Sequence, residues 1–169
     1  DVIRATAAEA PVTVLYRDDK HATRLRDALA AAGVDAAHVT FDKVPFDSVW
    51  IRDWGPQVVT TLDGGQRMID TRYYKGRDED DVFPTRLALE RGLRSSRPAV
   101  ATEGGNLLSD GAGSCIIGST VGTRNATSLA RLEQLYLANY GCERLIELYA
   151  LEGEPTGHVD IYVTITGPR

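Results

Sequence analysis

Three helical segments separated by short apolar strands are the feature of the sequence that most limits its fold. The helices are predicted at about Lys20–Ala32, Val82–Arg94 and Ser128–Tyr140. Asp18-Asp19 precedes the first as an N-cap, and Gly33 or Gly141 follows the first and third, as helix C-termini require. The alternation predicts a mixed α/β fold in which one helix and several short strands recur, although the units share too little sequence to demonstrate duplication.

The predicted strands are short and bounded by turn residues. Asp63-Gly64-Gly65 and Asp110-Gly111-Ala112-Gly113 each predict a hairpin. Pro84 is expected only in the first turn of its helix, since a proline further inside removes a hydrogen bond. The strand ranges are 12–16, 38–41, 57–62, 66–70, 98–101, 106–108, 114–117, 144–148 and 160–166.

Length and charge restrict the class of protein. A chain of 169 residues with 43% hydrophobic and 25% charged residues fits a single globular domain over residues 1–169. A net charge of -5 argues against a nucleic-acid partner and is compatible with a cationic small molecule. No run approaches the roughly 18 apolar residues that a membrane span needs, so no membrane partner is expected.

Three polar clusters framed by glycine or proline carry the chemistry. They are Trp50–Pro56, Glu103–Asn106 and Gly157–Asp160. Each places an acid or an imidazole where the backbone can approach a ligand closely. Carboxylates and one histidine suit a flat cation, above all a guanidinium, which takes paired hydrogen bonds from carboxylates. We therefore expect one cleft to contain Asp53, Glu103, His158 and Asp160.

Each cluster also has a purely structural interpretation. Residues 52–56 could be a solvated turn entering a strand, with Trp50 in the core. Glu103–Asn106 could be a hairpin entry, and His158 with Asp160 an ordinary hydrogen-bonded pair on a strand. In the functional interpretation, Asp53 binds a substrate nitrogen and Trp50 packs against the substrate's stem or plane.

Metal chemistry is the main rival, and the spacing does not favour it. His21 falls in a predicted helix and His38 in a strand, and neither has ligand spacing to His158. The run Asp78–Asp81 is expected to be a solvated loop and helix N-terminus rather than a calcium site. No metal or other cofactor is expected.

A nucleophile is not evident. No Gly-x-Ser-x-Gly occurs. Cys115 lies in an apolar strand and Cys142 just past a helix C-terminus, which disfavours a thiolate. Both are predicted to be structural thiols, Cys115 a buried one, and the pair makes no disulfide framework that would indicate a compartment.

The motifs resemble a known family. Asp47–Pro56, then Glu103–Asn106 with Asp110-Gly111, then Gly157–Asp160 are similar to the agmatine deiminase and Porphyromonas-type peptidylarginine deiminase family. These guanidine-modifying enzymes have the pentein fold, a five-unit α/β propeller. The similarity covers about residues 11–165 and implies that about half of the ring is present.

The resemblance implies a role for each matching residue. Asp53 and Asp160 would clamp the guanidinium, with Trp50 stacked nearby and Glu103 as a supporting acid. His158 would protonate the leaving ammonia and later activate water. A cysteine thiolate would attack the guanidinium carbon, giving a thiouronium intermediate that water hydrolyses to a ureido product.

The family's nucleophilic cysteine follows the Gly-His-x-Asp motif in a glycine-rich segment, and this chain stops at Arg169, before that segment. The chain also starts as though the first strand of the propeller were missing. We therefore expect the chain alone to be inactive. We expect a complementary chain or fragment that carries the cysteine, or a homo-oligomer, to complete it, or else the chain to be a truncation or a compact remnant.

Several alternatives stay open. A non-catalytic guanidinium- or protein-binding remnant and an amidinotransferase would use the same residues. Lys75 and Arg77 resemble the pair that reads the α-carboxylate of a C-terminal arginine, or they belong to a solvated loop paired with Asp78–Asp80. The substrate is thus free or peptidyl arginine, or agmatine. The compartment would be cytoplasmic for the agmatine enzymes and secreted or periplasmic for the peptidylarginine enzymes.

Overall fold

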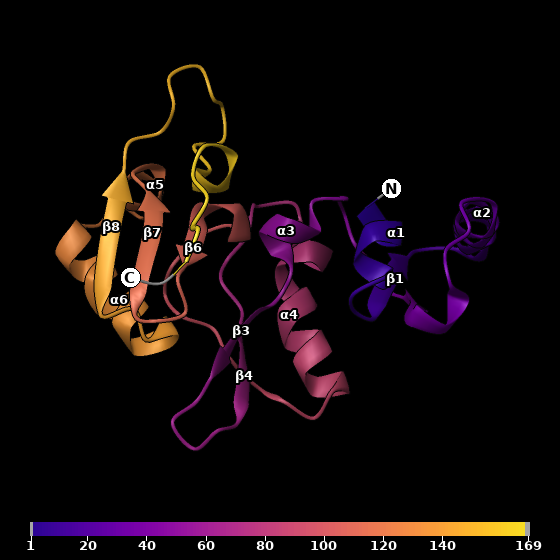
Figure 1. The fold of residues 1–169 in the computed structure, drawn as a ribbon. Helices are drawn as coiled ribbons and strands as arrows, with labels where there is room; N and C mark the ends of the chain where they lie inside the picture. Colours follow the sequence, from indigo (N-terminus) through magenta and orange to yellow (C-terminus); the bar gives the residue numbers. More distant parts are fainter. Residues whose placement is uncertain (1, 168–169) are drawn as a thin grey trace. The chain divides into compact units, whose positions relative to one another are not determined.

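The computed structural model describes residues 2–167. These form two compact units, one ending at Phe46 and one beginning at Asp47, and each is described by itself (Figure 1). A single domain over residues 1–169 stays a prediction. No helix among the described residues is long and apolar enough to cross a membrane.

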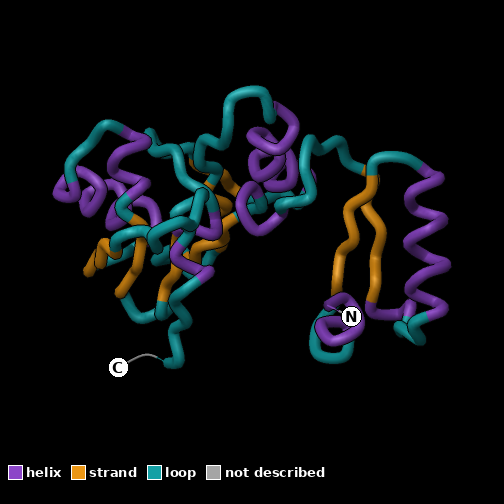
Figure 2. Tube along the Cα trace, turned by 90° about the horizontal axis from the view of Figure 1, so that it is seen from above, coloured by secondary structure: helices purple, strands orange, loops and turns teal. Residues whose placement is uncertain are grey.

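The first unit is a parallel strand pair joined by a helix. Strands β1 (Val12–Tyr16) and β2 (Val39–Lys43) pair in register from Val12 with Val39, and Figure 2 shows α2 (Asp19–Ala31) running alongside them. Asp18 caps α2, as predicted, by accepting a 2.8 Å hydrogen bond from the amide of His21. A further short helix, α1 (Val2–Ala7), and a 3-10 turn, η1 (Ala36–His38), were not predicted, because neither is long enough for a periodic pattern.

The second unit contains two three-stranded sheets of the same design. In each, an antiparallel hairpin is followed by a helix and then by a strand parallel to the middle one. The predicted recurrence of a helix with short strands is therefore present in the structure. The first sheet is formed by β3 (Gln57–Thr60), β4 (Gln66–Ile69) and β5 (Arg94–Ser96), with helix α4 (Asp78–Glu90). The second is formed by β6 (Leu107–Ser109), β7 (Ser114–Gly118) and β8 (Arg144–Leu148), with helix α6 (Leu129–Tyr140).

Helix α4 begins four residues before its predicted start. The acidic run Asp78–Asp81 forms its first turn, where carboxylates favour the helix dipole. Pro84 consequently lies in the second turn, not the first as expected. The expectation that this run is solvated is wrong for Asp80, which is fully buried.

Two predicted strands are absent. The chain at 98–101 contributes only an isolated bridge between Ala101 and Arg72, because Pro98 has no amide to donate to a ladder. The predicted strand at 160–166 is replaced by a 3-10 turn, η3 (Val159–Ile161), in which the carbonyl of Val159 accepts from residues 162 and 163.

The core of the second unit lies between α6 and the second sheet, which Figure 1 shows side by side. Leu132 and Tyr136 of α6 are fully buried, whereas Leu129 is exposed. Ser128 caps this helix, and Gly141 ends it in the left-handed conformation with φ of 72°.

Cys115 and Cys142 lie in this core and form a disulfide, with Cα atoms 5.6 Å apart. Cys115 is buried, as predicted. The prediction that both are structural thiols is wrong, because β7 and the residue after Gly141 lie close enough for the two sulfurs to bond.

We expect reduction of this disulfide to destabilise the chain. The cysteines are 27 residues apart, and a closed loop of that length lowers the entropy of the unfolded chain by the equivalent of about 3–4 kcal/mol. Denaturant unfolding with and without dithiothreitol measures the loss. The Cys115→Ala, Cys142→Ala double variant is the control and should not respond to reductant. Two titratable thiols in the unfolded, unreduced protein would contradict the bond.

Candidate functional site

Four residues from distant parts of the sequence meet in the second unit. Asp53 Oδ1 lies 3.4 Å from His158 Nδ1, and it accepts a 3.2 Å hydrogen bond from the amide of Gly105. Any Cβ at Gly105 would lie 2.6 Å from His158 Nδ1, 2.8 Å from Asp53 Oδ1 and 3.2 Å from Asp160 Oδ1. Any other residue here would therefore displace at least one of these side chains. We call Asp53, Gly105, His158 and Asp160 the acid–imidazole cluster.

A short helix presents Asp53. The segment interpreted as a motif contains α3 (Ile51–Trp54), not a plain turn. Trp54 anchors it in the core, packing edge-on against Phe83 with ring centroids 5.1 Å apart and donating to Ser48 Oγ at 3.1 Å. Trp50 is 62% exposed, so the alternative that places Trp50 in the core is wrong.

Buried Asp80 fixes the chain just before α3. One of its carboxylate oxygens accepts from the amides of Asp47 and Ser48, and the other accepts from Ser48 Oγ at 2.7 Å. A buried carboxylate held by several donors is difficult to displace, because each lost bond leaves a desolvated charge. The first turn of α4 therefore positions the segment that carries Asp53.

Glu103 lies beside the cluster but is already paired. It is 3% exposed and forms an ion pair with Arg124 of α5 (Thr120–Asn125). The Arg124 guanidinium also sits 4.3 Å from the ring centroid of Tyr74. Burial and the adjacent Glu103 carboxylate raise the pKa of Tyr74 to about 12.

The segment before His158 is held by Glu154. Its carboxylate accepts from the amides of Thr156 and Gly157, which closes a turn. Gly157 has φ of 70°, and a Cβ there would lie 2.4 Å from the Thr120 side chain, so glycine is required. The turn delivers His158 almost fully buried, and its Nε2 has no hydrogen-bond partner among the described residues.

The electrostatics of the cluster suit one additional cation. Burial raises the pKa of Asp53, while the neighbouring His158 and the Gly105 amide oppose that shift. The guanidinium of Arg52 pairs with Asp160 at 3.2 Å, and that of Arg124 pairs with Glu103. The cluster and these neighbours together hold the carboxylates of Asp53, Glu103 and Asp160 and the two guanidinium groups. Their charges sum to one net negative charge while His158 is neutral.

Lys75 and Arg77, predicted as carboxylate readers, lie in the loop before α4. Arg77 Nη1 is 3.8 Å from Asp80 Oδ2, a pairing that the structural alternative anticipated. Lys75 is exposed and has no ion pair among the described residues. The structure does not place either side chain in the acid–imidazole cluster.

Sequence reasoning gave no role to three residues that the geometry brings forward. Gly105 was noted only as a frame for Glu103, and Arg52 only as a neighbour of Asp53. Arg124 lies in α5, a short helix that was not predicted. A pattern of glycine between acidic motifs signals close packing, but nothing local in the sequence indicates which arginine meets which acid.

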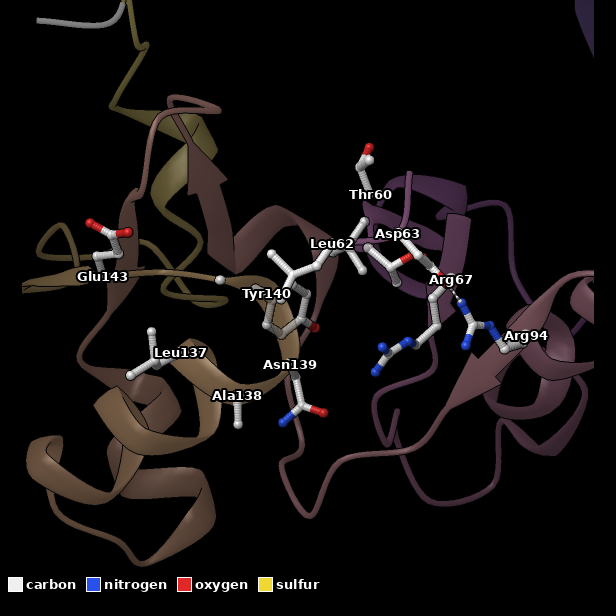
Figure 3. A pocket seen from close by; sticks show the side chains of 13 residues that line it. Thr60, Leu62, Asp63, Arg67, Arg94, Leu137, Ala138, Asn139, Tyr140 and Glu143 are labelled. Carbon is white, nitrogen blue, oxygen red and sulfur yellow. Dashed lines mark hydrogen bonds and ion pairs between the residues drawn. The ribbon is translucent and has the colours of Figure 1, made fainter. Parts of the chain in front are cut away.

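Other hollows of the second unit lie apart from the cluster. A cavity of about 670 Å³ separates the β3–β4 hairpin from the end of α6, with Arg67 and Leu62 on one wall and Asn139 and Tyr140 on the other (Figure 3). It contains the 3.1 Å ion pair between Arg94 and Asp63 but no member of the acid–imidazole cluster.

A second hollow, of about 90 Å³, also has no member of the acid–imidazole cluster in its described lining. Glu103, Arg124 and Tyr74 are among the residues that line it.

Among the described residues, no group of three or more His, Cys, Asp or Glu side chains is arranged to hold a metal ion.

Comparison with solved structures defines the class of fold. An agmatine deiminase of Enterococcus faecalis superposes with a TM-score of 0.78 at 20% identity, over 94% of this chain and 47% of that one. An agmatine deiminase of C. jejuni with substrate bound gives 0.76 at 17% identity, over 93% and 48%. The chain thus has the mixed α/β fold of agmatine deiminase structures, while a closed propeller and the fraction of it present stay predictions.

The family follows from the sequence comparison. The model of the Porphyromonas-type peptidyl-arginine deiminases matches residues 1–169, and the chain belongs to this family. A Vibrio parahaemolyticus protein named "Putative agmatine deiminase" is 26% identical over 144 residues, 75% of this chain and 39% of that protein. A Shewanella frigidimarina protein of the same name is 28% identical over 96 residues, 51% of this chain and 26% of the relative. The chain therefore spans less than half the length of these relatives.

The raised pKa of Asp53 predicts a pH-dependent effect of Asp53→Asn. A carboxyl whose pKa rises above 3.8 on folding favours the fold while it is protonated and destabilises the fold as pH rises through the folded pKa. The stability difference between variant and parent should therefore be constant below about pH 3.8 and should shift in favour of the variant as pH rises to the folded pKa. Denaturant titrations between about pH 2 and 7 measure the difference in unfolding free energy.

Asp63→Asn is the matched control of opposite sign. Hydrogen bonding to Thr61 and Gly65, with the Arg94 charge, lowers the pKa of Asp63 to about 2. Asp63 therefore stabilises the fold above its unfolded pKa, and that contribution disappears as pH falls towards 2. A stability difference for Asp53→Asn that does not change with pH would contradict the assigned environment.

Proposed function

We propose that this chain supplies the guanidinium-binding and acid–base residues of a hydrolytic deiminase acting on arginine or agmatine. The observation that carries the proposal is the meeting of Asp53, His158 and Asp160 around the backbone of Gly105. Family membership and the net negative charge of the cluster support it. Non-catalytic binding of a guanidinium would use the same residues.

In this proposal the carboxylates of Asp53 and Asp160 hold the substrate guanidinium in their plane. The cysteine thiol gives its proton to His158, its thiolate bonds to the guanidinium carbon, the C–N bond breaks, and ammonia leaves with that proton. His158 then takes a proton from water, whose oxygen bonds to the carbon as the C–S bond breaks and the thiolate is regenerated. The oxygen's remaining proton passes to ammonia, so the products are a ureido compound and an ammonium ion.

Cys115 and Cys142 are unsuited to be that nucleophile. They are bonded to each other and buried in the core of α6 and the second sheet. The thiouronium step therefore needs a cysteine other than these two. We accordingly propose that a segment or chain carrying that cysteine completes the site.

The exposed Trp50 and the partly exposed Asp160 indicate where a substrate would enter. Trp50 is the residue before α3, three positions from Asp53. An indole there can cover the face of a guanidinium or its aliphatic stem. Glu103 would act at longer range, because Arg124 already compensates its charge.

The function is tested by guanidinium binding in two glycine variants. Gly105→Ala would force its methyl group against His158 and Asp53, and it should weaken binding of agmatine and arginine by about tenfold or more, as expected when a charge-assisted hydrogen bond is lost. Gly122→Ala is the matched control, because a Cβ there meets its neighbours at 3.5 Å or more. Isothermal titration calorimetry gives the constants. If the parent binds neither compound, or both variants bind alike, the proposed site is wrong.

The choice between arginine and agmatine is tested at Lys75 and Arg77. We propose that they read a substrate α-carboxylate, which agmatine lacks, and that Arg77 does so while close to Asp80. Arg77→Ala should then weaken arginine and a peptide ending in arginine by several fold and leave agmatine unchanged. Arg131→Ala, on the exposed face of α6, is the control. An equal effect on all three ligands would refute the carboxylate reader.

A further inference from the structure

Arg52 contacts the acid–imidazole cluster through the carboxylate of Asp160. Its Nε donates to Asp160 Oδ2 at 3.2 Å, whereas the other oxygen of that carboxylate, Oδ1, is the one that faces Gly105. The two oxygens of Asp160 are thus divided between an internal guanidinium and the cluster.

The Arg52 side chain is held at both ends of its guanidinium. Nη2 donates to the carbonyl of Leu107, the first residue of β6, at 3.4 Å. At its base, the Arg52 carbonyl packs so closely on residue 104 that a Cβ there would lie 2.0 Å away. The arginine therefore connects α3, η2 (Gly104–Asn106) and β6 to Asp160.

The hollow beside Arg52 is not the one that adjoins Glu103. Arg52, Gly104 and Leu107 line a cavity of about 480 Å³ whose described lining includes none of Asp53, His158 and Asp160. A substrate held between Asp53 and Asp160 would bind Oδ1 of Asp160, while Oδ2 would keep its hydrogen bond from Arg52.

We propose that Arg52 is a positioning residue of the guanidinium site. It fixes the rotation of the Asp160 carboxylate through Oδ2, so that Oδ1 points at the bound guanidinium. This inference rests on the proposed function. The opposite role is that of an internal competitor, in which the Arg52 guanidinium occupies the carboxylate that a substrate needs.

The two roles predict binding changes of opposite sign. If Arg52 positions Asp160, Arg52→Ala should weaken agmatine binding by about tenfold, the effect of one lost charge-assisted hydrogen bond. Arg52→Lys should recover only part of this, because one ammonium cannot reach both Asp160 and Leu107. Tighter binding by Arg52→Ala would overturn the proposal in favour of competition. Arg131→Ala is the control for removing one positive charge.

A double-mutant cycle separates positioning from a general structural effect. In an Asp160→Asn background, Arg52→Ala should change agmatine binding by less than about twofold, because both act through one carboxylate. Equal effects of Arg52→Ala in both backgrounds would overturn the proposal. A parent chain that binds no agmatine would instead refute the proposed function, on which this role depends.

Nuclear magnetic resonance tests the contact itself without any ligand. The Nε–H of Arg52 should exchange with water about tenfold faster, or more, in Asp160→Asn than in the parent, since its acceptor has lost its charge. Unchanged exchange would overturn the positioning role even if agmatine binds. The Nε–H of Arg94, a residue whose Nη2 pairs with Asp63 elsewhere, should be unaffected in the same spectra.

Discussion

The close approach of the Gly105 backbone to Asp53, His158 and Asp160 is the constraint on which the site depends. A single methyl group at this position would overlap two of the three side chains. The absence of a Cβ lets Asp53 bond the residue 105 amide and lie within 3.4 Å of the imidazole at once. Because protein interiors relax little around an inserted atom, this one glycine couples three segments that are up to 107 positions apart in the sequence.

Compensation of charge explains why so many acids can share a small volume. Two carboxylates beside each other repel, and burial adds a desolvation cost. Arg52 and Arg124 offset that cost at Asp160 and Glu103, whereas the partners of Asp53 within residues 2–167 are His158 and the amide of Gly105. Burial raises the pKa of Asp53, and His158 and the Gly105 amide oppose that shift.

The sequence predicted the repeating helix-and-strand units and the convergence of Asp53, His158 and Asp160 better than it predicted boundaries. Local signals sufficed for β1, β8 and the cap of α6, because alternation and Ser128 or Gly141 specify them directly. They failed at α4, because the acidic turn that begins the helix has the composition of a solvated loop. Only the tertiary structure shows that Asp80 accepts hydrogen bonds from the amides of residues 47 and 48.

The disulfide and the internal arginines could not be predicted for a related reason. Cys115 and Cys142 become neighbours only when β7 and β8 pair, and Arg52 meets Asp160 only when α3 packs against η2. These are tertiary contacts between residues that no local pattern relates. The choice of acid for each arginine is set by the path of the backbone, as the close packing of residue 104 on Arg52 illustrates.

The order of the three motifs follows from the repeated architecture. Asp53 lies in α3, directly before the first strand of the first sheet, and Glu103 directly precedes η2, before the first strand of the second. His158 and Asp160 lie at η3, which follows β8 as η2 follows β5. These connections pack against one another, α3 on η2 and η2 on η3. The repeated sheets of the second unit thereby bring three single-motif connections together at one site, with each connection contributing its acid or imidazole and glycine providing the room for them to meet.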